Sequence, residues 1–430
     1  MEHIIESTYP LSFRQDEAGH LGEQLQQSHS VELVGMKRVG INNFLRFFLF
    51  HEGIKEKYMP QDGRHLFILV DLNDLIEREL FPFWRLTFKR IVDRVEKSDV
   101  ADAVKKKIAA LFVATIQTGD LFLTYDGVRE ALVLLSGENL YPTIFFNRFD
   151  RITESATADF FNNLESLRDA THNRLSYVFT SYRELDGLMP NAFQRKNLPL
   201  FSNIVYITPA SKEDSLTILE SMQQRHHLHL PLVEQENLVT LAGGYVQYLQ
   251  IFALILSEHK EKGEMNEKKL FDLFFSDERI ALQSEEIWES LTKKEQEILS
   301  DVIAGKEVSE EEKSDAHYVW DTGILVKDIV FSTLFKEYVK KRQGSPHEES
   351  NHIELSKKEH MLLELLKLKP NEITEREDIV EKVWPEYQEY GVSDWSIDRL
   401  VARLRSKLKQ QKAEYEIQTI RTRGYKLLTK

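Results

Sequence analysis

Short apolar runs separated by longer amphipathic stretches organise the first half of the chain. Five such runs, rich in Val, Ile, Leu, Phe and Tyr, are predicted strands at residues 31–34, 65–72, 141–152, 174–185 and 201–211. The stretches between them have the spacing and composition of helices, most clearly over residues 12–27 and 74–135. Strands that alternate with helices predict an α/β fold with a parallel sheet, which we assign to residues 1–210.

Beyond residue 211 the strand pattern stops and the apolar positions follow helical spacing. Residues 211–278 are predicted to be a helical lid. Residues 279–340 are predicted to be a second small helical unit, with LTKKEQEILSDVIAG as a clear amphipathic helix. The segment 341–352 contains Gly, Ser, Pro and charges without a large apolar residue, so we expect a linker before the last domain, residues 353–430.

The last domain is predicted to contain three helices and a terminal hairpin. Ser356 with Glu359, and Thr374 with Glu377, have the spacing of capping boxes at the starts of the first two helices. The third helix, SDWSIDRLVARLRSKLKQ, carries an apolar stripe at helical spacing, made of Ile397, Leu400, Val401, Leu404 and Leu408. The alternating segment YEIQTIRTRGYKLL, with a tight turn at RTRG, predicts the hairpin.

Charge is distributed unevenly along the chain. The net charge of −14 argues against a generally basic nucleic-acid coat. From Arg399 onward, however, ten Lys and Arg residues are opposed only by Glu414 and Glu416. A helix with cations on its free face, followed by a basic hairpin, suits the grooves of a DNA duplex. The alternative interpretation is a solvated basic face on a structural helix.

The motifs LSKKEHMLLELL, REDIVEKVW, SIDRLVARLRSKL and TIRTRGYKLL follow one another over residues 353–429. In order and spacing they closely resemble the OmpR/PhoB-type winged helix domain of bacterial response regulators. The resemblance implies a recognition helix at 394–409, a wing at 416–428 and double-stranded DNA as a partner. Groove contacts would fall on Trp395, Ser396, Arg399 and Arg403, phosphate contacts on Arg405 and Thr419, and a wing contact on Arg421, while Lys407 and Arg423 belong to the same basic set.

Three positions depart from the pattern of that family. Trp395 replaces an Arg that is usual in the family, Leu400 replaces a frequent His, and Thr422 replaces a usual Gly in the wing turn. We expect these departures to change which bases are read rather than whether DNA is bound.

The segment SHSVELVGMKRVGINNFLRFFLF (28–50) has the outline of a phosphate-binding loop. Gly35 and Gly40 are five residues apart, after a predicted strand and before a predicted helix, as in G-x-x-x-x-G-K-[ST]. Ile41 and Asn42 stand where that pattern has its Lys and its Mg²⁺-binding Ser or Thr. The candidate nucleotide-binding residues are Gly35, Lys37, Arg38, Gly40, Ile41, Asn42, Asn147 and Arg148.

Further segments before the linker resemble the ORC/STAND-like branch of AAA+ ATPases. TIFFNRFDRI corresponds to a strand that usually ends in Asp-Glu, but Asn147 and Arg148 stand there. YVFTSYRE resembles the sensor strand, with Arg183 on the phosphate side, and LAGGYVQYLQ resembles a lid motif, with Val246 for the customary Pro. Residues 286–340 resemble the winged helix that often follows the lid, so we assign residues 279–340 to a middle winged-helix-like domain. The resemblance therefore implies a degenerate P-loop module.

The substituted positions remove the groups that ATP hydrolysis requires. Ile41 offers no charge to the β- and γ-phosphates, Asn42 is a neutral ligand at best, and Arg148 would repel a metal ion. We therefore expect a pseudo-ATPase without enzyme activity and a nucleotide-free α/β scaffold. Backbone N–H groups of the loop, with charge from Lys37 and Arg38, could still hold an anion. Binding of ATP or ADP is thus an alternative.

No metal site is predicted. His226, His227 and His229 lie together in RHHLHL, but a metal needs three or four converging ligands, and the chain contains no Cys. Asp71 and Asp150 lie near the ends of predicted strands, where Asp often caps the following turn.

The interpretation that we favour is a cytoplasmic, sequence-specific DNA-binding transcriptional regulator. The start MEHIIESTYP lacks the regions of a signal peptide, and no apolar run reaches about 18 residues, so we expect no membrane partner. The N-terminal module would sense a signal or mediate oligomerisation, with the chain itself or other proteins as partners. The alternatives are a nucleotide-dependent STAND-type switch and a non-catalytic protein-interaction scaffold.

Overall fold

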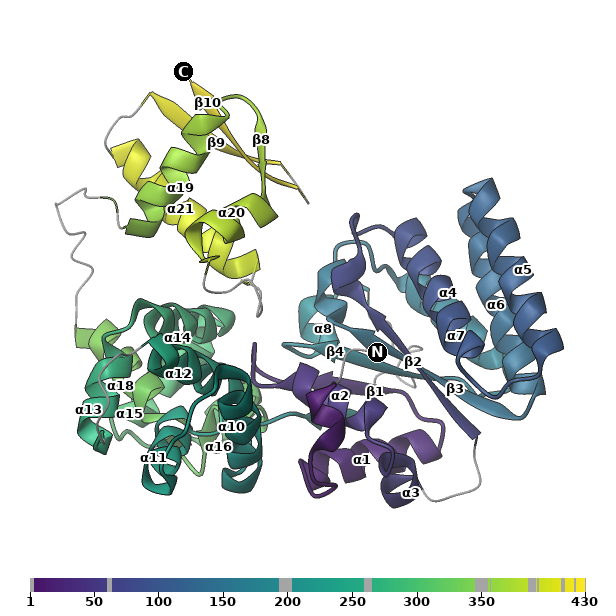
Figure 1. Ribbon diagram of the computed structural model, residues 1–430, viewed down its shortest axis with the longest axis horizontal. Helices are drawn as coiled ribbons and strands as arrows, with labels where there is room; N and C mark the ends of the chain where they lie inside the picture. Colours follow the sequence, from purple (N-terminus) through teal and green to yellow (C-terminus); the bar gives the residue numbers. More distant parts are fainter. Residues whose placement is uncertain are drawn as a thin grey trace. The chain divides into compact units, whose positions relative to one another are not determined.

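The computed structural model describes most of the chain (Figure 1). The described residues are 4–59, 64–192, 203–258, 265–344, 355, 357–385, 392, 394–410, 414–420 and 423–429. They form two compact units: the first comprises Met1–Gln283 with Ser290–Lys340, and the second comprises Ser284–Glu289 with Lys341–Lys430. Within the described residues, no helix is both long enough and apolar enough to cross a membrane.

A five-stranded parallel sheet forms the centre of the first unit. Its strands are β1 (Val31–Val34), β2 (Arg64–Asp71), β3 (Leu140–Asn147), β4 (Ser176–Ser181) and β5 (Ile204–Tyr206). They lie in the order β2-β3-β4-β1-β5, and every pair is parallel. The predicted α/β fold with a parallel sheet is therefore confirmed. The third predicted strand is too long, because it ends at Asn147, where the left-handed backbone of Arg148 (φ 59°) turns the chain.

Helices connect these strands, as parallel pairing requires. The helices of this part are η1 (Ile5–Thr8), α1 (Gln15–Gln26), α2 (Ile41–Phe50), α3 (Ile54–Tyr58), η2 (Leu72–Asp74), α4 (Leu80–Glu96), α5 (Asp102–Thr118), α6 (Leu121–Gly137), η3 (Phe149–Ile152), α7 (Ala158–Ala170) and α8 (Leu185–Leu188). α1 confirms the helix predicted near the N terminus. The long helical stretches predicted over 74–135 are α4, α5 and α6, which pack against one another (Figure 1).

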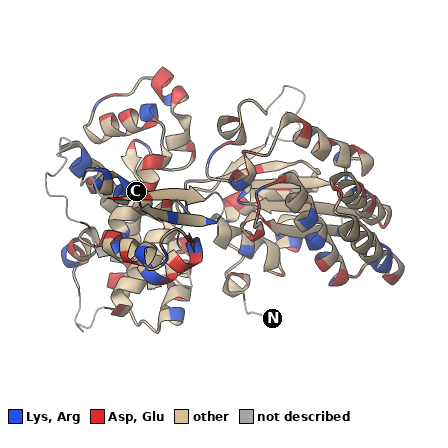
Figure 2. Cartoon of the chain, turned by 90° about the horizontal axis from the view of Figure 1, so that it is seen from above, with Lys and Arg blue, Asp and Glu red and all other residues tan. Residues whose placement is uncertain are grey.

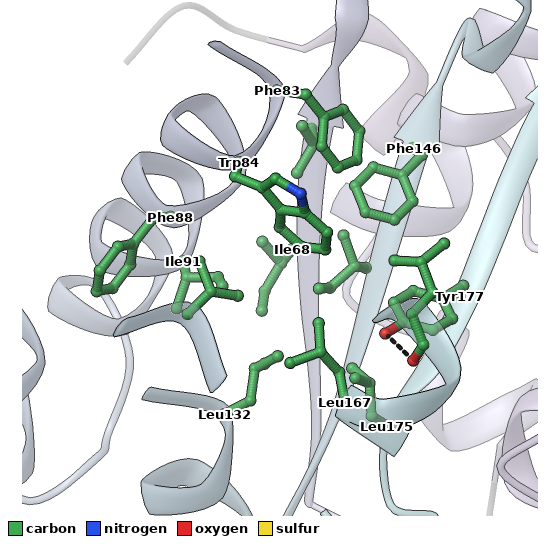
Figure 3. Packing of buried hydrophobic residues seen from close by; sticks show 14 of the residues in the cluster. Ile68, Phe83, Trp84, Phe88, Ile91, Leu132, Phe146, Leu167, Leu175 and Tyr177 are labelled. Atoms are coloured by element: carbon green, nitrogen blue, oxygen red, sulfur yellow. Dashed lines mark hydrogen bonds between the residues drawn. The ribbon is translucent and has the colours of Figure 1, made fainter. Parts of the chain in front are cut away.

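Alternate side chains of the strands build a core on each face of the sheet. Phe67 of β2 and Phe145 of β3 lie against Phe48 of α2 on one face. The neighbouring positions, such as Phe146, belong to the cluster on the other face with side chains from α4, α6 and α7 (Figure 3). There Tyr177 is buried and donates its hydroxyl to the Leu164 carbonyl at 2.9 Å. Burial on both faces explains why the strands are continuous apolar runs.

The rest of the first unit is mostly helical, as predicted. Its elements are α10 (Lys212–His226), α11 (Leu232–Ala242), α12 (Val246–Glu258), α13 (Glu267–Phe275), α14 (Glu278–Ser290), α15 (Lys293–Ile303), α16 (Glu310–Asp315), α17 (His317–Asp321), the antiparallel strands β6 (Leu325–Val326) and β7 (Ile329–Val330), and α18 (Thr333–Gly344). Capping boxes begin α15 at Thr292 and α16 at Ser309. From α14, Ser284–Glu289 belong to the second unit.

Three helices and a three-stranded antiparallel sheet form the main part of the second unit. The elements are α19 (Lys357–Leu368), β8 (Ile373–Glu375), α20 (Arg376–Val383), α21 (Asp394–Gln410), β9 (Tyr415–Ile420) and β10 (Gly424–Thr429), with the sheet order β8-β10-β9. The apolar stripe predicted on the third helix is buried in the core with Tyr425 and Leu427. The predicted three helices and hairpin are therefore confirmed.

One predicted helix start in this unit is wrong. Thr374 does not cap α20, because it lies in β8 and pairs with Tyr425 of β10. α20 begins one residue later, after Glu375, which makes no side-chain capping hydrogen bond. Ser356, the other predicted cap, lies outside the described residues.

Candidate nucleic-acid interface and phosphate-loop region

The loop between β1 and α2 needs its two glycines for packing. A Cβ on Gly35 would lie 2.6 Å from the Ile207 carbonyl oxygen, which is backbone and cannot move aside cheaply. Gly40 has a φ of 117°, and a Cβ there would lie 2.6 Å from Cγ2 of Val246. Both positions therefore require glycine for steric reasons, whether or not a phosphate binds.

Polar groups of this loop are bonded to neighbouring parts of the first unit. The Tyr245 hydroxyl donates to the Lys37 carbonyl at 2.6 Å, and the Lys37 ammonium lies 4.7 Å from the centre of the Tyr182 ring. Arg38 donates to the Gln247 side chain at 3.4 Å. The two cations predicted to attract an anion thus have contacts within the protein.

At the carboxyl edge of the sheet, five side chains form one polar cluster. We call Asn42, Asp71, Asn147, Arg148 and Thr180 the strand-end cluster. The Asn147 amide donates to both Asn42 and Asp71 at 3.1 Å, and Arg148 pairs with Asp71 at 3.0 Å. The Thr180 hydroxyl donates to the side-chain amide oxygen of Asn147 at 2.9 Å and accepts from the Arg148 backbone N–H at 2.7 Å. The structure therefore brings together Asn42, Asn147 and Arg148, as the predicted site requires.

The chemistry of the strand-end cluster differs from that of a metal-assisted hydrolase. Its one carboxylate, Asp71, already accepts from the Arg148 guanidinium and from the Asn73 backbone N–H of η2. A guanidinium beside the carboxylate supplies a fixed positive charge where a metal ion would otherwise bind. No group of three or more potential metal ligands occurs among the residues that the structure describes.

Two further residues near this edge have partners of their own. Arg183, predicted to lie on the phosphate side, instead donates both Nη atoms to Glu295 of α15 at 2.8 and 2.9 Å. Its guanidinium also lies 4.0 Å from the centre of the Tyr318 ring. Asp150 is half-buried, and desolvation raises the pKa of its carboxyl group. Arg183 is thus held by partners within the first unit.

Three cations share one face of α21. Arg399, Arg403 and Lys407 are four residues apart, so they lie one above another along the helix. Their side chains remain 33%, 35% and 30% exposed. They form the row that would face a duplex, and Figure 2 shows Lys and Arg in blue near the C terminus. Ser396, one turn before Arg399, is half-buried.

Carboxylates of the second unit contact this row. Arg399 donates to Glu285 at 3.0 Å and pairs with Glu289 at 2.8 Å, and Arg403 donates to the same Glu285. Lys407 pairs with the buried Glu359 of α19 at 2.6 Å. These acids were not identified from the sequence, because isolated Glu residues far along the chain carry no signal of which cation they contact.

Arg405 connects the helix to the hairpin. Its Nε donates to the Ile417 carbonyl at 2.9 Å and its Nη2 donates to the Thr419 hydroxyl at 2.7 Å. The structure therefore brings together the two residues predicted to contact phosphate, and their hydrogen bonds tie α21 to β9. Arg423 is well exposed and pairs with Glu375 at 2.7 Å. Arg421 and the side chain of Trp395 lie outside the described residues.

A buried polar group that the sequence did not indicate supports the turn end of the hairpin, where Tyr425 pairs with Thr419. Arg376 of α20 donates to the Tyr425 hydroxyl, which in turn donates to Asp398 of α21. Burial, with the nearby Asp398 carboxylate, raises the pKa of the Tyr425 hydroxyl. This chain of hydrogen bonds joins α20, α21 and β10.

Residues 349–427 match the family model described as "Transcriptional regulatory protein, C terminal". The same region is similar to the heme response regulator HssR of Staphylococcus haemolyticus, with 36% identity over 97 residues, 23% of this chain and 40% of that protein. It is also similar to HssR of Staphylococcus epidermidis, with 38% identity over 78 residues, 18% of this chain and 34% of that protein. The chain thus spans two fifths or less of these relatives. The predicted resemblance of the C-terminal domain is confirmed.

Solved structures give a more distant comparison. The Walker-type ATPase PABY2304 of Pyrococcus abyssi is 14% identical with a TM-score of 0.46, covering 76% of this chain and 95% of that one. The Aeropyrum pernix ORC1 protein in complex with DNA is 11% identical with a TM-score of 0.43, covering 98% and 90%. Identities and scores this low carry no argument about activity.

Proposed function

We propose that this chain is a sequence-specific DNA-binding transcriptional regulator. The observation that carries the proposal is the row Arg399, Arg403 and Lys407 on α21, within a region that matches a transcriptional regulatory family. A cationic helix beside a basic hairpin gives phosphate contacts to the duplex, and Arg side chains in the major groove can read guanine. Trp395, Ser396, Arg421 and Arg423 are proposed to complete the contact surface.

The first unit is proposed to act without ATP hydrolysis, as a pseudo-ATPase that senses a signal or mediates oligomerisation. The Arg148–Asp71 pair supports this assignment, because it places a cation against the strand-end carboxylate. Phosphoryl transfer needs a lysine at the phosphates and acids that hold Mg²⁺ and orient water, and Ile41 and Asn147 provide neither. No nucleotide cofactor is proposed.

The DNA proposal can be tested on the full chain. A selection from random duplexes, followed by fluorescence anisotropy on the enriched sequence, should give a specific complex. Arg399→Ala with Arg403→Ala should weaken that complex by about tenfold or more, and reduce its dependence on salt. The control is Arg85→Ala with Lys97→Ala, two exposed cations of the first unit, which change net charge equally. No enrichment and no binding at low salt would instead support a protein-interaction scaffold.

A nucleotide-dependent switch is the second candidate function. The feature that favours it is the retained glycine loop between β1 and α2, whose backbone could hold a phosphate group. The test is an ATP and an ADP titration of the wild type, with Ile41→Arg as the variant that blocks the loop. Binding in the low micromolar range that is lost in Ile41→Arg, with turnover altered by Arg148→Ala, would establish the switch and reject the nucleotide-free assignment.

A further inference from the structure

The hairpin of α5 and α6 exposes an unusual amount of apolar surface. Among the described residues, fourteen large apolar side chains are exposed, and six of them lie on these two helices. They are Val113, Ile116, Leu121, Phe122, Leu123 and Val133. Phe122 is 71% exposed and Val113 is 54% exposed. A cluster of this kind on one surface element commonly marks a contact with another protein.

The exposure does not result from poor packing of the hairpin itself. Ile108 and Thr115 of α5 are buried. Gly127 of α6 packs so closely that an added Cβ would lie 2.9 Å from the Thr115 side chain and 2.8 Å from the Phe88 ring. Asp120 caps α6 by accepting from the Leu123 backbone N–H at 2.9 Å. The apolar side chains are thus presented on helices that already have a core, so binding would order little further structure.

The solvent side of α5 lets another helix approach closely. Its exposed positions include Ala103, Ala110 and Ala114 around Val113, so few long side chains cover the helix backbone. Both α5 and α6 contain 17 residues, which corresponds to about 25 Å of helix at 1.5 Å per residue. Five of the six exposed apolar side chains lie between Val113 and Leu123, on either side of the turn at Gly119 and Asp120, so the apolar surface is concentrated at that end of the two helices.

Charges on the hairpin point to a second copy of this chain as the occupant. Lys106 is exposed seven residues before Val113, and Asp120 is exposed seven residues after it. Lys106 therefore lies about 10 Å from Val113 along α5, whereas Asp120 lies beyond the opposite end of α5, in the turn after Gly119. A twofold axis near Val113 places Lys106 of each copy opposite Asp120 of the other, because an isologous interface pairs each patch with itself in reverse.

We propose that the α5–α6 hairpin is a self-association surface, on which two copies pack their α5 helices antiparallel around Val113 and Phe122. This assignment names the surface for the oligomerisation role proposed for the first unit and rests on that role. Because the dimer would form without DNA, its test is separate from the test of DNA binding. A dimer formed in this way would carry two winged helix domains.

The test is sedimentation velocity of the full chain without DNA. The wild type should show reversible dimerisation in the micromolar range. Phe122→Glu, which places a charge among the exposed apolar side chains beside the turn between α5 and α6, should weaken the dimer by about tenfold or more. Leu232→Glu is the matched control, because Leu232 is 77% exposed on α11, away from the hairpin. It should leave the dimer unchanged.

Charge reversal gives a second and more specific measurement. Lys106→Glu and Asp120→Lys should each weaken self-association, because each places like charges opposite one another. An equimolar mixture of the two variants should associate again, since the mixed pair restores both attractive contacts. Recovery on mixing cannot come from misfolded chains. A wild type that stays monomeric throughout the micromolar range, or a dimer that Phe122→Glu leaves intact, would overturn the assignment.

Discussion

The phosphate-loop region and α21 both carry the outline of a known motif, but they satisfy their polar groups in different ways. At the loop, the strand-end cluster closes on itself through the neutral Asn147 amide and the Arg148–Asp71 pair. On α21, the cations pair with carboxylates and stay about one third exposed. Arg148 is 35% exposed, as much as Arg403, so exposure does not separate the two regions; they differ because α21 presents three cations on one face, whereas the strand-end cluster has one guanidinium bonded to its one carboxylate. Motif outline alone therefore does not identify a binding site.

The pH dependence of stability due to Glu32 measures how far water is excluded beside β1. We expect it to give the largest change in the free energy of unfolding. Glu32 lies on β1, is only 2% exposed and accepts from the Leu185 backbone N–H at 2.9 Å. Burial raises the pKa of its carboxyl group from 4.5 to about 8. The folded chain then keeps a proton that the unfolded chain releases, so the free energy of unfolding falls as pH rises from 4.5 to about 8. The expected loss is at most about 5 kcal/mol.

Glu32→Gln should remove most of this pH dependence while keeping an acceptor for Leu185. Thermal unfolding at pH 6 and pH 9, compared between the variant and the wild type, measures the difference. The exposed Glu213→Gln serves as the control. Equal pH dependence in the wild type and in Glu32→Gln would show that Glu32 is hydrated in the folded state.

Gly35→Ala tests whether the loop glycine is required for packing. The new Cβ would lie 2.6 Å from the Ile207 carbonyl oxygen, so β1 and the segment after β5 must separate. We expect a loss of about 2–3 kcal/mol in the free energy of unfolding, measured by urea denaturation. Gly19→Ala in α1 is the control, because nothing lies within 4 Å of its Cβ. A neutral Gly35→Ala would contradict the packing role.

Arg405→Lys and Arg403→Lys should distinguish an arginine that stabilises the domain, Arg405, from one that is proposed to contact DNA, Arg403. A lysine cannot replace the two hydrogen bonds from Arg405 to Ile417 and Thr419, so Arg405→Lys should destabilise the winged helix domain by about 1–2 kcal/mol. Arg403→Lys should leave stability unchanged and weaken the specific complex. Urea unfolding and anisotropy measured on both variants give the two readouts. Equal loss of stability in both would remove the distinction.

Glu285→Gln should have the smallest effect of these variants, and it should raise DNA affinity rather than lower it. Arg399 and Arg403 both donate to Glu285, which competes with a phosphate for the same guanidinium groups. Removing its charge should raise DNA affinity by about three- to tenfold, or roughly 1 kcal/mol. The control is Glu278→Gln, an exposed acid of the same helix. Unchanged affinity would show that this contact does not compete with DNA.

Local patterns predicted much of the fold. The apolar runs identified all five parallel strands, because burial on both faces removes polar positions from a strand. The apolar stripe from Ile397 to Leu408 predicted the buried face of α21, because residues three and four apart lie on the same face of a helix. The helical stretches predicted over 74–135 are also present, with Gly119 and Asp120 at the turn between α5 and α6.

Contacts between distant residues account for what the sequence did not predict. Thr374 has a good capping-box spacing, but its pairing with Tyr425 depends on β10, about fifty residues later. The partners of Arg183 and Arg399, namely Glu295 and Glu285, are more than one hundred positions away. Such pairs leave no periodic signal. The cations were therefore identified from the sequence, whereas the acids that hold them were not.

The hydrogen bonds of Arg405 have a consequence for how a duplex would be read. Since they join α21 to β9, the proposed recognition helix and wing would not tilt independently of each other. A target must therefore present its base edges and its neighbouring backbone at one fixed separation. Groove width would then count toward selectivity together with base identity, including at base pairs that no side chain touches.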